Sequence, residues 1–166
     1  MIDLAAAGDP VVTSENSHPH QKVGVVVGVD ETVGSEPALQ YAFEQAQQGR
    51  QMLRAVHAWR EPTHDCAPWV CYDLEVLGLA KKKFTSGRLD TWRPHYPEVT
   101  VIEDIRHGCP VEALVDASVG ADLLVVGARG RAADSGTLGS VCGAVLLRAS
   151  CPVVVVRCRK QGRDND

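Results

Sequence analysis

The chain has 166 residues and a formal net charge of −4 at pH 7, and 45% of its residues are apolar. This length and composition predict a single globular domain with one core and exclude an intrinsically disordered chain. The negative charge disfavours a general nucleic-acid binder, which needs a basic face, and no apolar run approaches the roughly 20 residues of a membrane span.

The N-terminal stretch is polar and rich in turn-forming residues, which predicts a flexible leader over residues 1–21. It lacks the basic start and the apolar core of a secretion signal, so we expect the protein in the cytoplasm. That compartment favours free thiols, and the six cysteines contain no Cys-x-x-Cys pair. The spacing of His64, Cys66 and Cys71 matches no structural zinc motif, so we expect no metal site there.

Apolar runs of strand length alternate with segments of helical periodicity along the rest of the chain. In chain order the predicted elements are strand 23–29, helix 35–48, strand 52–59, helix 74–92, strand 99–105, helix 110–120, strand 122–126, helix 140–149 and strand 153–156. Ser35 is the expected N-cap of the first helix and Gly49 its stop. The first strand is apolar on both faces, which is typical of a strand buried between two helix layers.

This alternation predicts a Rossmann-like α/β fold, a single domain over residues 22–158 followed by a charged tail at 159–166. The expected sheet is open, parallel and five-stranded, with right-handed crossovers that place helices on both faces. Ligands of such sheets bind beyond the carboxyl ends of the strands, where the strand order reverses. Asp30 and Gly127 both lie at carboxyl ends, so they share one crevice if the first and fourth strands are neighbours.

A glycine-rich corner follows the fourth strand. Gly127 comes directly after the apolar run, Gly130 follows three positions later, and the pair Gly139-Ser140 opens the next helix. Glycine lets a ligand approach the backbone closely, and the first amides of a helix carry roughly half a positive charge without a helical partner. This arrangement suits a phosphate, and Arg129 and Arg131 add positive charge beside it. A simple tight turn between strand and helix is the alternative interpretation.

Taken together, these residues resemble the universal stress protein family over roughly residues 22–158. The matching motifs are Gly28-Val29-Asp30, Val56-His57-Ala58, Gly108-x-Pro110-x-x-x-Leu114, Val126-Gly127-x-x-Gly130 with Gly139-Ser140, and Cys151-Pro152 followed by four valines. The resemblance implies the strand order 3-2-1-4-5. It also implies a homodimer in which the last strands of two chains pair edge to edge.

The resemblance to the ATP-binding branch of the family further implies a nucleotide site. It places Asp30 at the ribose or phosphate side and the Ala58 backbone at the adenine. The residues that it implies for the phosphates, through backbone or hydroxyl groups, are Val126, Gly127, Gly130, Gly139, Ser140 and Val141, with Arg129 beside them. A carboxylate repels phosphates, so we expect Asp30 to accept ribose hydroxyls or to hold Mg²⁺ together with the ATP.

The sequence shows no nucleophile with a base, no carboxylate dyad and no metal cluster. We therefore expect a stress-response protein that binds ATP or a related adenine nucleotide as a regulatory ligand and hydrolyses it slowly at most.

Eight residues separate Gly130 from Gly139, where the ATP-binding branch has nine, and Asp134 lies among them. This difference favours the alternative of a nucleotide-free member that acts through protein contacts. A third reading, an ATP-consuming enzyme of a related fold, lacks the usual phosphate motif after the first strand.

Two histidines have both a chemical and a structural interpretation. His57 near the end of the second strand is expected to pack against its neighbours rather than to act in catalysis. His107 lies two positions before Cys109, where it could activate a thiolate, but packing at the start of a helix explains the pair equally well.

Overall fold

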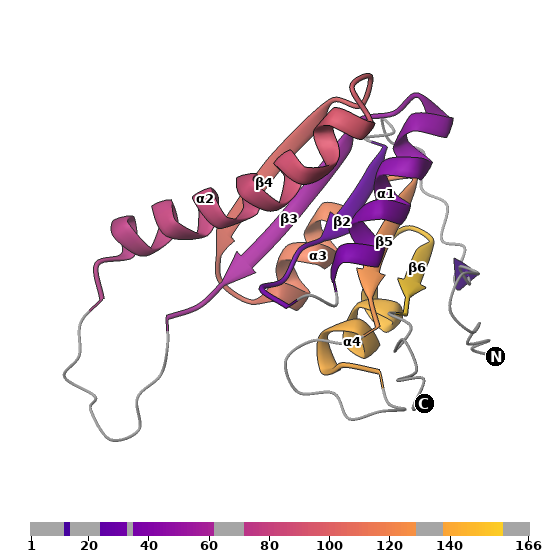
Figure 1. The fold of residues 1–166 in the computed structure, drawn as a ribbon. Helices are drawn as coiled ribbons and strands as arrows, with labels where there is room; N and C mark the ends of the chain where they lie inside the picture. The colour runs from indigo at the N-terminus through magenta and orange to yellow at the C-terminus, as the bar shows by residue number, and fades with distance from the viewer. Residues whose placement is uncertain (1–11, 14–23, 33–34, 62–71, 129–137, 158–166) are drawn as a thin grey trace, which may run out of the picture.

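The structure, a computed structural model, describes residues 12–13, 24–32, 35–61, 72–128 and 138–157. Its strands form one six-stranded sheet in the order β1-β6-β5-β2-β3-β4 (Figure 1). The strands are β1 (Val12–Thr13), β2 (Val25–Gly28), β3 (Leu53–Trp59), β4 (Val101–His107), β5 (Leu123–Gly127) and β6 (Val153–Val156). The helices are α1 (Glu36–Gly49), α2 (Leu74–Trp92), α3 (Pro110–Ser118) and α4 (Ser140–Arg148), with a 3-10 turn at Arg93–His95.

The five strands from β2 to β6 are parallel and confirm the predicted order 3-2-1-4-5. β1 is an addition that the sequence did not predict. It pairs antiparallel with β6, with Val12 opposite Val154 and Thr13 opposite Val153. Two strand residues are too few to leave a periodic pattern, so only the tertiary structure shows that this stretch joins the edge of the sheet.

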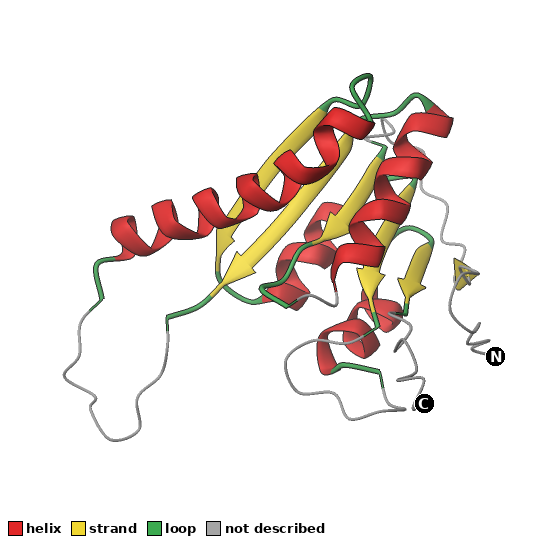
Figure 2. Cartoon of the chain, viewed as in Figure 1, coloured by secondary structure: helices red, strands yellow, loops and turns green. Residues whose placement is uncertain are grey.

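Helices cover both faces of the sheet. In Figures 1 and 2, α1 and α2 lie on one face, and α3 and α4 lie on the other. Successive side chains of a strand point to opposite faces, so Val25 and Val27 pack with α1, whereas Val26 packs with α3 and α4. All three valines are fully buried, which explains why the sequence of this strand is apolar without alternation.

α1 buries one stripe against β2 and β5. Its buried residues recur at helical spacing and are Ala38, Leu39, Ala42, Phe43 and Ala46. The Phe43 ring stacks on Tyr96, with 5.3 Å between ring centroids, and lies 6.5 Å from the Trp92 ring. Burying such a side chain contributes about 1.5–3 kcal/mol to the free energy of unfolding, so this stripe and its aromatic partners hold α1 and the end of α2 together.

The end of α1 differs from the prediction. Gly49 does not stop the helix but forms its last residue, and Arg50 takes the left-handed conformation with φ at 50°. The Gln51 side chain passes over Gly49, where a Cβ would lie 3.0 Å from its Oε1 atom, and its Nε2 donates to the carboxylate of Asp122. The glycine therefore makes room for a tertiary contact rather than for the turn itself.

Two other boundaries also differ. Ser35 occupies the N-cap position of α1, but its hydroxyl donates to the Thr32 carbonyl oxygen at 3.1 Å instead of capping the helix. β4 begins and ends two residues later than the predicted strand 99–105. A turn in which the Val99 amide donates to the Tyr96 carbonyl delays its start, and pairing between His107 and Trp59 extends its end.

α2 is the longest helix, with 19 residues, and it packs mainly through its C-terminal half. Its buried side chains are Thr85 and Leu89, whereas Val76 and Leu79 in the first half are exposed. Figure 1 shows this first half extending past the carboxyl ends of β3 and β4. Neither α2 nor any other helix in the described ranges combines the length and the apolar run that a membrane crossing needs.

Alanine substitutions at two glycines, Gly87 and Gly24, test the backbone geometry at these positions. A methyl group added to Gly87 in α2 would meet no atom within 4 Å, so Gly87→Ala should raise the free energy of unfolding by about 0.5–1 kcal/mol. Gly24 has a φ of +95°, and a methyl group there would overlap the Met52 carbonyl oxygen. Gly24→Ala should therefore lower the free energy of unfolding by about 1–3 kcal/mol. Urea denaturation followed by circular dichroism measures both values, and effects of the same sign would contradict this geometry.

Candidate functional site

The strand order reverses at β2, which has β3 on one side and β5 on the other. Gly28 is level with Val56 of β3, and Val27 is level with Val125 of β5. Asp30 comes two residues after Gly28, and Ala58 comes two residues after Val56. The first and fourth predicted strands are therefore neighbours, as the sharing of one site by Asp30 and Gly127 requires.

The start of α4 returns to the same edge of the sheet. Gly139 is the N-cap of α4, and its N–H donates to the Ala128 carbonyl oxygen at 3.0 Å, one residue after β5 ends. No side chain caps this helix in the described part of the chain. The amides of Ser140, Val141 and Cys142 open the helix and have no helical acceptor. Ser140 is exposed and Cys142 is buried, so the helix is anchored while its first residue faces solvent.

Seven of the nine predicted site residues belong to the described ranges, and all seven lie at the carboxyl edge of the sheet or at the start of α4. They are Asp30, Ala58, Val126, Gly127, Gly139, Ser140 and Val141. We call this group the switch-point site. The other two, Arg129 and Gly130, lie outside the described residues, as do Arg131 and Asp134. Their predicted roles stay predictions.

The carboxylate of Asp30 is held from one side. Its Oδ1 atom accepts hydrogen bonds from the Thr32 backbone N–H at 2.9 Å and from the Thr32 hydroxyl at 2.7 Å. No described residue donates to the other oxygen, Oδ2. Asp30 is half-buried, so Oδ2 keeps its capacity to accept a ligand hydroxyl or to contact a cation.

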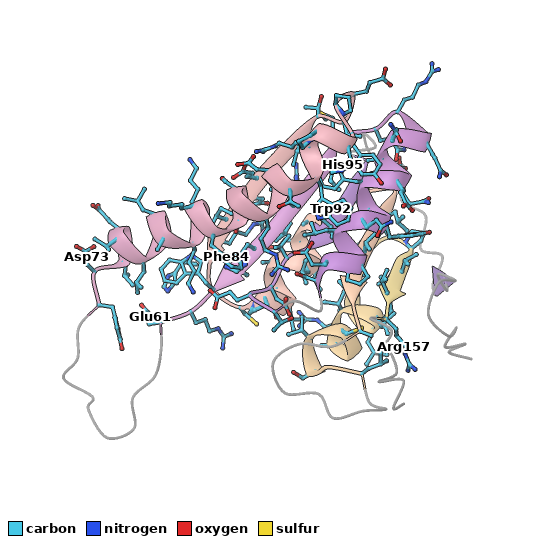
Figure 3. All side chains as sticks on the ribbon, viewed as in Figure 1. Glu61, Asp73, Phe84, Trp92, His95 and Arg157 are labelled. Atoms are coloured by element: carbon cyan, nitrogen blue, oxygen red, sulfur yellow. The ribbon has the colours of Figure 1, made fainter. Side chains whose placement is uncertain are left out.

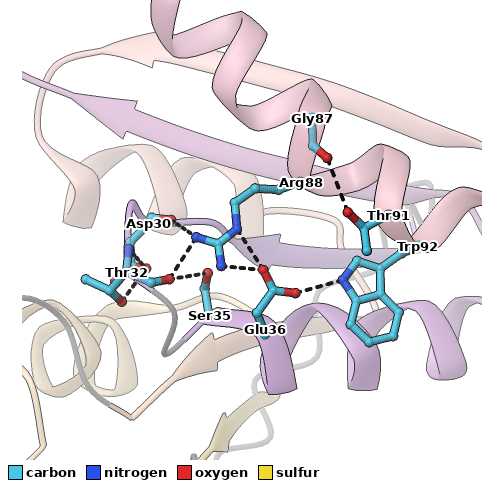
Figure 4. A network of polar contacts seen from close by, with 8 residues as sticks. All are labelled: Asp30, Thr32, Ser35, Glu36, Gly87, Arg88, Thr91 and Trp92. Atoms are coloured by element: carbon cyan, nitrogen blue, oxygen red, sulfur yellow. Dashed lines mark hydrogen bonds and ion pairs between the residues drawn. The ribbon is translucent and has the colours of Figure 1, made fainter.

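The turn after β2 is bound to α2 by a polar network that the sequence did not reveal (Figure 4). Arg88 donates from Nη1 to the carbonyl oxygens of Thr32, at 2.8 Å, and Asp30, at 3.2 Å. Its Nε donates to Glu36 Oε1 at 2.9 Å, and the Trp92 indole N–H donates to Glu36 Oε2 at 3.0 Å. A single arginine in a helix carries no motif, and its partners lie more than 50 positions away, so no pattern in the sequence marks it.

His57 packs at the end of β3, as predicted. Its side chain is buried, Nδ1 lies 2.8 Å from the Val29 carbonyl oxygen, and the ring faces Phe84 of α2 at 6.1 Å between centroids. Figure 3 shows Phe84 between α2 and β3. A carbonyl only accepts hydrogen bonds, so Nδ1 carries the proton. The Nε2 atom is buried without a partner among the described residues.

A separate groove of about 470 Å³ lies between the first half of α2 and the ends of β3 and β4. Its lining residues are Trp59, Glu75, Gly78, Leu79, Lys82, Ile105 and His107. The His107 ring lies 4.7 Å from the Trp59 ring, and its Nε2 is 3.3 Å from Glu61 Oε2. These contacts occupy His107 with structural partners, which favours packing over activation of Cys109.

The three described cysteines are free thiols in different environments. Cys109 precedes α3, where the nearby backbone N–H groups of Glu112 and Val111 and the charge of Arg60 hold its pKa below the usual value. Burial raises the pKa of Cys142 and of Cys151 to about 11. No three His, Cys, Asp or Glu side chains gather as a metal site within the described ranges.

Comparison with known proteins identifies the relatives of this chain. The model of the universal stress protein family matches residues 24–157. Universal stress protein Rv2623 of Mycobacterium tuberculosis (strain ATCC 25618 / H37Rv) is 36% identical over 141 residues, which make up 84% of this chain and 46% of that protein. Universal stress protein Rv2005c of the same strain is 36% identical over 138 residues, 82% of this chain and 46% of that protein. The chain thus spans about half the length of these relatives.

Solved structures of the same kind share the fold. Universal stress protein UspA from Lactobacillus plantarum superposes with a TM-score of 0.62 at 22% identity, over 84% of this chain and 100% of that chain. A universal stress protein in complex with cAMP superposes with a TM-score of 0.61 at 28% identity, over 80% of this chain and 95% of that chain.

The pKa values of the cysteines predict their order of alkylation. At pH 7 iodoacetamide should modify Cys109 about 100-fold faster than Cys142 or Cys151, because only the thiolate reacts and the two buried thiols stay protonated. Mass spectrometry of peptides from timed samples measures the three rates. Protein unfolded in urea is the control, in which the rates should converge. A Cys109 rate as slow as that of Cys142 in the folded protein would refute the assignment.

Proposed function

The chain belongs to the universal stress protein family, and from this we propose that it binds ATP or a related adenine nucleotide at the switch-point site. The observation that carries the proposal is the start of α4, which no described side chain caps and which Gly139 binds to the end of β5, the strand next to β2. Free amides at a helix start attract phosphate. We propose that nucleotide binding acts as a regulatory signal in the stress response rather than as one step of efficient catalysis.

The residues fit the parts of a nucleotide. The backbone N–H groups of Ser140 and Val141, with the Ser140 hydroxyl, offer donors to the phosphates. The Gly139 N–H is already bonded to the Ala128 carbonyl oxygen, so Gly139 leaves room for close approach of the ligand. Oδ2 of Asp30 offers an acceptor to a ribose hydroxyl or a contact to Mg²⁺. Ala58, two residues beyond Val56 on the neighbouring strand β3, offers backbone groups to the base. Arg129 and Gly130 would extend the phosphate site, and Val126 and Gly127 would form its floor.

A relative in complex with cAMP supports an adenine nucleotide as the ligand class. Cyclic AMP and ATP share the adenine and a sugar–phosphate, and they differ in the phosphate chain and in the 3′-hydroxyl. The amides that open α4 suit either phosphate group. Asp30 is a poor candidate for a catalytic base because its Oδ1 already accepts two hydrogen bonds from Thr32, which agrees with binding and at most slow hydrolysis.

The expected homodimer, the cytoplasmic location and the flexible leader over residues 1–21 stay proposals. β1 pairs with Val153 and Val154 of β6, so a second chain that paired along the whole of β6 would have to displace it. A partner could still pair beyond β1 along the outer edge of the sheet, because an edge strand keeps unpaired backbone groups on one side.

Isothermal titration with ATP and Mg²⁺ tests the proposal. Binding should be detectable below millimolar ATP, Asp30→Asn should weaken it about tenfold, and Ser140→Ala should weaken it about threefold because the backbone amide remains. Asp116→Asn is the control, since its side chain is 71% exposed on α3 and lies toward the far end of that helix. No heat from wild-type protein at millimolar ATP would refute nucleotide binding.

The shortened loop supports the alternative, a nucleotide-free member that acts through protein contacts. The eight residues between Gly130 and Gly139 lie mostly outside the described ranges. Inserting one leucine after Ser135 restores the nine residues of the ATP-binding branch. If wild-type protein binds nucleotide, the insertion should change affinity less than about threefold, because the entropic cost of closing a loop grows only slowly with its length. Binding that appears only in the lengthened variant would establish the alternative.

A further inference from the structure

We propose that Arg88 of α2 is a positioning residue for Asp30, and that it sets the preference of the switch-point site for a ligand with free sugar hydroxyls. This inference rests on the proposed function, because it concerns the same site. The segment from Asp30 to Thr32, here called the Asp30 turn, is bound by residues of three neighbouring segments.

Arg88 binds the Asp30 turn through its backbone. One nitrogen, Nη1, donates to the carbonyl oxygens of both Asp30 and Thr32. The other two, Nε and Nη2, donate to the carboxylate of Glu36 in the first turn of α1. The guanidinium bridges the two ends of the β2–α1 connection, and only 12% of the Arg88 side chain is exposed. An alkyl or amide side chain could not replace this fork, because five donors in one plane are specific to arginine.

The partners of Arg88 are themselves held in place. Glu36 accepts from the Trp92 indole N–H through its second oxygen, Oε2, and the guanidinium carbon of Arg88 lies 5.6 Å from the centre of the Phe84 ring. Figure 4 shows Arg88 reaching down from α2 between the Asp30 turn and Glu36. Arg88 is therefore one member of a fixed arrangement and not a mobile surface arginine.

The same turn is fixed from two more directions. His57 of β3 donates from Nδ1 to the carbonyl oxygen of Val29, directly before Asp30. Ser35 donates its hydroxyl to the carbonyl oxygen of Thr32. With Arg88, these bonds engage the carbonyl groups of Val29, Asp30 and Thr32, so the peptide planes around Asp30 have little freedom to rotate.

The orientation of the backbone decides the orientation of the carboxylate. Oδ1 of Asp30 accepts from the N–H and the hydroxyl of Thr32, and Thr32 is held through its carbonyl by Arg88. Arg88 of α2 thereby sets the orientation of Oδ2, although α2 contributes no residue to the switch-point site. Loss of Arg88 would leave the Asp30 carbonyl oxygen and Oε1 of Glu36 without this donor. The Thr32 carbonyl would be held by Ser35 alone, and the turn could then adopt other conformations.

A positioning role and a purely structural role of Arg88 predict different effects on ligand binding. If Arg88 only held α2 on the protein, its loss would lower stability and weaken every nucleotide equally. If it directs Asp30 toward sugar hydroxyls, its loss should weaken ligands that carry those hydroxyls and spare ligands that lack them. ATP and 2′,3′-dideoxy-ATP differ in those two hydroxyls alone, so the ratio of their dissociation constants reports the contact.

The experiment measures both dissociation constants by titration calorimetry for wild-type protein, Arg88→Gln and Arg88→Lys. Wild-type protein should bind ATP about tenfold more tightly than dideoxy-ATP, and Arg88→Gln should reduce this ratio to about twofold or less. Arg88→Lys keeps the charge but lacks the fork, so its ratio should also fall. Thr32→Val removes one donor to Asp30 Oδ1 and should lower the ratio by about threefold.

Arg93→Gln is the matched control. Arg93 follows α2, also has two carboxylate partners, Asp90 and Glu103, and does not contact the Asp30 turn. Its substitution should leave the ratio at the wild-type value, whatever it does to the melting temperature. If Arg88→Gln does not fold, the result with Arg88→Lys decides the question.

The possible outcomes test nucleotide binding and the positioning role of Arg88 separately. Wild-type protein that binds neither nucleotide refutes the proposed function, and the positioning role with it. Wild-type protein that binds both equally, or Arg88 variants that keep the tenfold ratio, refute the positioning role and leave nucleotide binding intact. A ratio that collapses in both Arg88 variants and survives in Arg93→Gln establishes Arg88 as the residue that directs Asp30.

Discussion

The backbone of β2 is hydrogen-bonded in parallel to β3 on one side and to β5 on the other, with Val25 level with both Leu53 and Leu123. Since all three strands run the same way, their carboxyl ends meet at one edge of the sheet. The chain leaves this edge toward different faces, to α1 after β2 and to α3 after β4. The switch-point site exists because this pairing brings together residues that are about 100 positions apart in sequence.

Two opposite electrostatic features meet at that edge. The start of α4 offers backbone donors and a partial positive charge, and Asp30 offers an acceptor with a negative charge. Gly139 binds the start of α4 to Ala128, directly after β5, and β5 is the neighbour of β2, the strand that precedes Asp30. A ligand with an anionic end and a neutral, hydroxyl-bearing part would match both features, whereas a simple anion would meet repulsion from Asp30.

α2 contributes to the fold in an uneven way. Its first half is largely exposed, and its second half binds the protein through Leu89, Thr85 and the polar network around Arg88 and Glu36. A partly buried ion pair of this kind adds little net stability, because desolvation offsets much of the attraction between the charges. Its effect is geometric, since it allows one arrangement of the turn after β2 and disfavours others that would leave charges without partners.

The sequence by itself determined the sequence of strands and helices, the buried character of β2 and the glycine corner around Gly127 and Gly139, because these follow from local periodicity and backbone freedom. It could not determine that Arg50 rather than Gly49 turns the chain after α1, that β1 joins the edge of β6, or that Arg88 holds Asp30. Each of these depends on contacts between segments far apart in sequence. Such contacts exist only once the strand order is set, so the tertiary structure alone decided them.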